Sequence, residues 1–171
     1  AAFSDVSADA WYAEAVEYCR RHGIMNGVSD TAFAPEETLT RAMLVTILWR
    51  QAQKPVVNYL MQFSDVPEGQ WYSEAVRWAA SEKLVGGYGD GRFGTNDPIT
   101  QEHLNLIFQR YTDQPVTDGI PGFDGGSKPA ARAQAAMAVM NYALLPQQGT
   151  AGGEVLVAYF SATGTTRTET T

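Results

Sequence analysis

The side chains that most often carry catalysis or bind metals are few and scattered in this chain. His22 and His103 are the only histidines, and neither has a carboxylate or cysteine at metal-ligand spacing. Glu36 and Glu37 are adjacent, so their side chains point apart and form no acid and base pair. The loop at 90–97 lacks the alternating ligands and terminal glutamate of a calcium loop, and no Gly-x-Ser-x-Gly nucleophile motif occurs. We therefore expect no metal and no self-contained active site.

Aromatic side chains are the better candidates, because a flat ring can stack on a sugar. Three tyrosines with amphipathic rings lie beside predicted loops, and we expect them to line a groove: Tyr12, Tyr72 and Tyr88. Three tryptophans fall on apolar helical stripes, which predicts core packing: Trp11, Trp71 and Trp78.

Composition indicates a folded, acidic protein. The 171 residues are 44% hydrophobic, and 12 basic against 19 acidic residues give a net charge of -7. An acidic chain without a basic patch argues against nucleic acid as a partner. No apolar run approaches the roughly 18 residues that span a bilayer, and the first residues lack the features of a signal peptide. From this alone, the protein is either cytosolic or has lost a signal.

A repeat positions these residues. Phe3-Ser4-Asp5-Val6 returns as Phe63-Ser64-Asp65-Val66, and the offset (63 − 3 = 60) holds without a gap to Thr40 and Thr100. The same offset leads to Phe123-Asp124, which predicts the start of a third unit there.

Each unit is predicted to form a helix, an irregular loop and a second helix. Thr40 and Thr100 are expected to cap the second helices, and Gly23 is expected to end the first helix of the first unit. Lys83 replaces that glycine in the second unit, so we expect that helix to end in another way. The fold class is therefore mainly α.

The motifs resemble the S-layer homology domains of bacterial cell-envelope proteins, over roughly residues 3–145. The family pattern is Phe-Ser-Asp-Val, a Trp-Tyr pair, a Gly-Gly-Tyr-x-Asp-Gly-x-Phe loop that includes Asp90, and Thr-Arg-Ala-Glu. The resemblance implies a pseudo-threefold helical bundle whose grooves bind secondary cell-wall polysaccharide, often through a pyruvylated sugar. It assigns the binding arginine to Arg41 and Arg132, while Gln101 occupies that position in the second unit and predicts one silent groove.

The chain departs from the family in two further ways. Met43 and His103 replace the capping glutamate, and only Gln134 can take its part. The third unit is also short, either because it is degenerate or because a segment is missing from the sequence, and we expect uncovered apolar surface on its neighbours. The predicted boundaries are 1–54, 55–115 and 116–147 for the three repeats, and 148–171 for a linker and a further segment.

This last segment has a different character. The apolar run at 155–160 predicts a strand that leads into a small polar loop, and the pair resembles the first strand and phosphate loop of flavodoxins. The resemblance implies that Ser161, Thr163, Gly164, Thr165 and Thr166 bind the FMN phosphate in a complete flavodoxin-like domain. The sequence stops before the second strand of such a domain, so we expect that the domain is cut off here and that the chain as given does not bind flavin tightly. A threonine-rich tail, or an edge strand added to another sheet, is the alternative.

Two main functions follow. The first is a non-catalytic, extracellular module that anchors an exported bacterial protein to the cell wall. The second is a flavodoxin-like FMN-binding redox protein, with an unknown redox partner, that the repeats carry to the wall. A helical scaffold for a protein partner, suggested by the short third unit, is a weaker third hypothesis.

Overall fold

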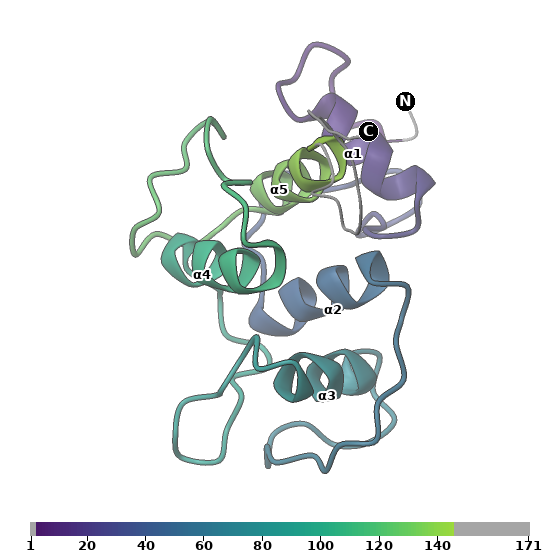
Figure 1. The fold of residues 1–171 in the computed structure, drawn as a ribbon. Coiled ribbons are helices and arrows are strands. Elements are labelled where there is room, and N and C mark those ends of the chain that lie inside the picture. Colours follow the sequence, from purple (N-terminus) through teal and green to yellow (C-terminus); the bar gives the residue numbers. More distant parts are fainter. Residues whose placement is uncertain (1–2, 146–171) are drawn as a thin grey trace, which may run out of the picture.

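The computed structural model describes residues 3–145, which form five α-helices joined by loops (Figure 1). The helices are α1 (Ala13–Arg21), α2 (Arg41–Gln51), α3 (Ser73–Ser81), α4 (Gln101–Thr112) and α5 (Arg132–Leu144). The mainly helical prediction is confirmed for this part of the chain. The flavodoxin-like strand and loop, with Ser161 to Thr166, lie outside the described residues and stay a prediction.

Three helices begin where the capping residues predict. The hydroxyls of Thr40 and Thr100 accept hydrogen bonds from the amides of Met43 and His103, each at 3.1 Å. Gln134 Oε1 accepts from the Ala131 amide at 3.0 Å, which is the role that we expected of it. These bonds satisfy amides that a helix leaves unpaired in its first turn.

The ends of α1 and α3 correct one expectation. Gly23 follows α1 in the left-handed region, with φ +68°, as a C-terminal glycine should. Lys83 adopts nearly the same conformation, with φ +62°, and its amide bonds to Ala80 O at 3.1 Å. The second unit therefore ends its helix in the same way as the first, with a residue for which this backbone is unfavourable.

A ring of backbone hydrogen bonds joins the three units. Leu39 N donates to Ala130 O, Ala130 N donates to Ile99 O, and Ile99 N donates to Leu39 O, each at 2.9 Å. All three residues have 0% exposure. Two further sets of three equivalent backbone bonds join the same units, with donors at 41, 101 and 132 and at 42, 102 and 133. These bonds place equivalent residues of the three units around one axis.

The same ring shows that Phe123-Asp124 does not begin a unit. The spacing around the axis is 60 residues from Leu39 to Ile99 (99 − 39) but 31 from Ile99 to Ala130 (130 − 99). Asp124 therefore occupies the position of Phe33 and Phe93, near the end of the loop. The predicted unit start is wrong, because two matching letters at the expected offset are a weak signal beside the backbone register.

A loop replaces the missing first helix of the third unit. Helix α1 packs against α5, and α3 packs against α2, whereas no helix within residues 3–145 takes the equivalent place against α4 (Figure 1). The segment after α4 buries Val116 and Ile120. Thr117 donates to Asn105 of α4 at 2.7 Å, and Asn141 of α5 donates to Val116 O at 2.9 Å. This loop is thus fixed from both sides.

The exposed face of α4 is suited to the absence of that helix. At two equivalent positions, α4 has exposed polar residues where α2 and α5 have buried apolar ones. Glu102 corresponds to Ala42 and Ala133, and Asn105 corresponds to Val45 and Ala136. A helix face that packs against another helix is normally apolar. At these two positions α4 therefore leaves no apolar surface uncovered, although Leu106 of the same helix is 43% exposed.

Candidate functional site: grooves between the units

The predicted arginines lie at equivalent contacts between units. Arg41, Gln101 and Arg132 are the first residues of α2, α4 and α5. Arg41 Nε donates to Phe93 O at 2.8 Å, and Arg132 Nε donates to Phe33 O at 2.9 Å. Gln101 Nε2 makes the corresponding contact with Gly122 O at 3.2 Å. Each side chain thus ties its own unit to the loop of the next one.

Both arginines are buried and lie over aromatic rings. Arg41 and Arg132 are 7% and 6% exposed. The guanidinium of Arg41 lies 4.9 Å from the centroids of Tyr88 and Phe93, and that of Arg132 lies 4.7 Å from Phe33. Burial lowers the pKa of both guanidiniums, but arginine starts so high that both stay charged at neutral pH. Each places a positive charge in the lining of a cavity.

The first groove is a cavity of about 390 Å³ between the first and second units. Its walls are the loop at 26–28, the side of α2 with Met43 and Arg50, the ring of Trp71, and Arg132. Arg132 also donates through Nη2 to Asn26 O at 2.7 Å, which connects the base of the groove to the loop. Two cations and no carboxylate line this groove.

Trp71 is exposed, which corrects the prediction that it packs in the core. Trp71 and Trp11 are 55% and 43% exposed, whereas Trp78 is 5% exposed as predicted. The reason is that α1 begins at Ala13 and α3 at Ser73, so both exposed tryptophans precede the helix whose stripe they seemed to continue. Trp71 packs edge-on against Tyr72, with the ring centroids 5.0 Å apart. Trp71 thus lines the groove while more than half of the residue stays exposed.

The second groove is the equivalent cavity in the second unit and is smaller, about 260 Å³. It is lined by Arg41, the loop at 84–87, and His103, Leu106 and Arg110 of α4. No tryptophan lines it, because the shortened third unit has no Trp-Tyr pair. At the third equivalent position, Gln101 and Asn141 replace the two arginines. The three positions are therefore unequal.

The remaining predicted site residues are spread over several places. Tyr88 donates to Asp97 Oδ2 at 2.8 Å and lies over Arg41. Asp90 lies in an exposed turn and pairs with Arg92, Nε to Oδ2, at 3.0 Å. Tyr12 and Tyr72 are half-buried at the starts of α1 and α3. None of these four lines the first groove.

Sequence reasoning missed the role of two aspartates. Asp5 accepts hydrogen bonds from the amides of Phe33 and Ala34, at 2.9 and 2.8 Å. Asp65 makes the same pair of bonds with Phe93 and Gly94, both at 2.8 Å. These bonds from the Phe33 and Ala34 amides hold the pKa of Asp5 below its usual range. The aspartates fix the loops whose phenylalanine carbonyl groups accept hydrogen bonds from Arg132 and Arg41. The recurrence of an aspartate at the same position in both units could have indicated this role from the sequence.

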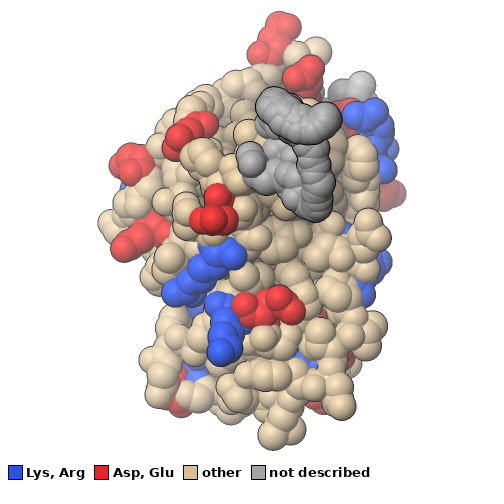
Figure 2. Space-filling view, in the orientation of Figure 1, with Lys and Arg blue, Asp and Glu red and all other residues tan. Residues whose placement is uncertain are grey.

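The described residues contain no group of three or more histidine, cysteine or acidic side chains that could hold a metal ion. None of the helices between residues 3 and 145 is long and apolar enough to cross a membrane. On the face shown in Figure 2, a few basic side chains lie left of the middle with acidic side chains directly beside them.

Comparison with known families matches residues 2–42 and 62–104 to the S-layer homology domain. These two segments are S-layer homology repeats. Each match covers a first helix, its loop and the start of the second helix, up to the residues that follow Arg41 or Gln101. The recognition of these repeats from their motifs is thereby confirmed.

Several curated proteins are similar to part of this chain. The chain is 32% identical over 109 residues to an amylopullulanase of Thermoanaerobacterium thermosulfurigenes, covering 63% of this chain and 6% of that protein. It is 31% identical over 126 residues to the surface-layer 125 kDa protein of Lysinibacillus sphaericus, covering 71% and 10%. It is 26% identical over 123 residues to the cellulosome-anchoring protein of Acetivibrio thermocellus, covering 68% and 27%.

The chain spans only a small part of each of these relatives. The family match and the S-layer and cell-surface proteins among the relatives confirm the predicted location at the cell surface. Nothing among these comparisons supports a flavin-binding domain.

Proposed function

We propose that this chain is a non-catalytic module that attaches an exported bacterial protein to the cell wall. Its ligand is an acidic secondary cell-wall polysaccharide, such as a pyruvylated glycan, bound in the first groove. One observation carries the proposal: the first groove combines Arg50 and Arg132 with an exposed tryptophan and has no acidic residue in its lining.

The chemistry of the first groove suits an acidic sugar. A guanidinium pairs with a carboxylate through two parallel hydrogen bonds, and such a pair is stronger in a partly dry groove than on an open surface. The ring of Trp71 offers a flat apolar face for a sugar ring. The names of the surface-layer and cellulosome-anchoring relatives agree with attachment to the cell surface.

The differences between the grooves favour the first one. The second groove keeps Arg41 and Arg110 but has no tryptophan wall. The third position keeps an exposed tryptophan, Trp11, but has Gln101 and Asn141 in place of the arginines. A ligand that needs both the charge and the ring is therefore bound best in the first groove.

The test is co-sedimentation of the purified chain with Gram-positive cell-wall sacculi that retain their acidic polymer and with sacculi stripped of it. We expect binding only to the intact walls. Trp71→Ala should weaken binding at least tenfold, whereas Trp11→Ala, a matched control at the other exposed Trp-Tyr pair, should change it less than twofold. Equal losses in the two variants, or equal binding to both kinds of wall, would contradict the proposal.

A further inference from the structure

A separate cavity lies on the flank of the second unit, beside α3 and the end of α4. It has a volume of about 430 Å³, and Tyr59, Gln62, Lys83 and Arg110 are among the residues that line it. Two of its lining residues are cations and none is acidic. In a chain with a net charge of -7, such a concavity favours anions. We call it the flank cavity.

Lys83 occupies a backbone position that favours glycine. Its φ of +62° matches that of Gly23 (+68°), the residue at the same place in the first unit. Lysine is strained in this conformation while glycine is not, so strain at a cavity wall is a reason to look for a function. Lys83 contributes a positive charge to the lining of the flank cavity. The first unit has no such charge at this position, because its residue there is Gly23.

The counterpart in the first unit has a different charge balance. Arg20 replaces Ala80 there, but Arg20 Nε pairs with Glu17 at 3.0 Å, so a carboxylate neutralises its charge. At Gly23 no atom lies within 4 Å of where a Cβ would be, so space does not exclude a side chain there. Lack of space therefore does not explain the glycine of the first unit, whereas its φ of +68° favours glycine.

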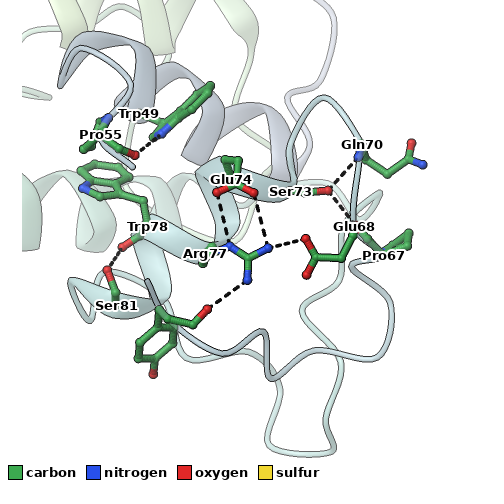
Figure 3. Close-up of polar contacts among 11 residues, drawn as sticks. Trp49, Pro55, Pro67, Glu68, Gln70, Ser73, Glu74, Arg77, Trp78 and Ser81 are labelled. Atoms are coloured by element: carbon green, nitrogen blue, oxygen red, sulfur yellow. Dashed lines mark hydrogen bonds and ion pairs between the residues drawn. The ribbon is translucent and has the colours of Figure 1, made fainter. Parts of the chain in front are cut away.

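Hydrogen bonds fix the walls of the flank cavity. Arg77 Nη1 donates to Tyr59 O at 2.9 Å, while Arg77 also pairs with Glu74 and Glu68 (Figure 3). Those two carboxylates are thereby engaged by Arg77 and do not line the cavity. On the other side, Arg110 Nη1 donates to Leu84 O at 3.1 Å, which uses one of the five donor hydrogens of the guanidinium.

The flank cavity adjoins the second groove. Val85, Gly86 and Arg110 line both, so Arg110 stands between Arg41 at one end and Lys83 at the other. We propose that Lys83 and Arg110 form an additional binding site for an acidic group of a glycan, a site that the first unit lacks. The inference rests on the proposed function, because the acidic glycan of the wall is the intended ligand.

The chain offers a matched pair of variants for the test. Lys83→Gly removes the cation and installs the residue that the first unit has, so the fold should not suffer. Lys54→Gly removes an exposed lysine that also has a positive φ, +54°, and that lines neither the flank cavity nor the second groove. Both variants change charge and backbone strain in the same way, and only one changes the site.

We expect Lys83→Gly to weaken binding to polymer-bearing sacculi three- to tenfold, and Lys54→Gly to change it less than twofold. Wall binding that persists with equal effects of the two variants would overturn the additional site and leave the proposed function intact. Absence of wall binding by the unaltered chain would instead contradict the proposed function.

A second measurement tests the site without the wall. Trigalacturonate, a short glycan with three carboxylates, is titrated into the 15N-labelled chain while amide shifts are followed by NMR. We expect the amides of Lys83, Val85 and Gly86 to move, and Lys83→Gly to weaken that response at least threefold while Lys54→Gly leaves it unchanged. Unmoved amides at these three residues, or equal responses in the two variants, would refute the site.

Discussion

Arg132→Ala should destabilise the fold substantially, although its position in the family motif suggests only a ligand contact. Arg132 is 6% exposed and donates to Phe33 O and Asn26 O, and its guanidinium lies over the Phe33 ring. A hydrogen bond from a charged donor contributes about 1.5 kcal/mol or more. The ring contact adds about 0.5–1 kcal/mol. The expected loss in the free energy of unfolding is therefore about 3–4 kcal/mol.

Urea unfolding followed by circular dichroism measures this loss, with Arg21→Ala as the control because that side chain is 61% exposed. We expect the control to lose less than about 0.5 kcal/mol. A loss below about 1 kcal/mol for Arg132→Ala would refute the reasoning that this arginine joins the third unit to the first. If the prediction holds, a loss of wall binding in this variant cannot be assigned to the ligand contact alone. The tryptophan variants then become the cleaner test of the groove.

Three further predictions concern the fold. Ile99→Ala should cost about 3 kcal/mol in urea unfolding because Ile99 is fully buried at the axis, and a loss near zero would contradict its central place. Lys83→Gly should raise the free energy of unfolding by about 1 kcal/mol by relieving left-handed strain, which thermal denaturation would show as a higher Tm; an unchanged or lower Tm would argue against strain. Asp5→Ala should destabilise the chain at pH 7, and the difference in stability from the unaltered chain should vanish on acidification. The reason is that the pKa of Asp5 is lower in the folded than in the unfolded chain. Such a carboxylate stabilises the fold at pH values above its unfolded pKa, near 4, and this stability is lost as the pH falls through the folded pKa. Unfolding curves from pH 7 to 2.5 would check this, and a constant difference would count against the amide bonds of Asp5.

The long repeat made most of the fold predictable from the sequence. The offset of 60 residues between Leu39 and Ile99 fixes which positions are equivalent, and the threonines at 40 and 100 mark two helix starts. The wrong expectation about two of the tryptophans has a simple cause. Trp11 and Trp71 fit a helical period, but sequence periodicity does not show that each helix begins two residues later. The exposure of the two tryptophan side chains could therefore be seen only in the structure.

The candidate site was less predictable, because it is built from several units. Arg50 and Trp71 lie in different units and Arg132 in a third, yet they line one groove. No local spacing brings them together. The motif arginines were found from the family pattern, but their burial and their bonds to Phe33 and Phe93 depend on the closed ring.

The closed ring also determines how the module would resist a pull. Tension applied at the end of α5 reaches backbone bonds to two other units at once, since Ala130 N is held by Ile99 O, and Arg132 N and Ala133 N are held by Glu37 O and Pro35 O. In a linear array of repeats, the last repeat would detach first and the others would follow one by one. Here the first and last units are neighbours, so the load is shared around the axis and rupture requires several bonds to break together.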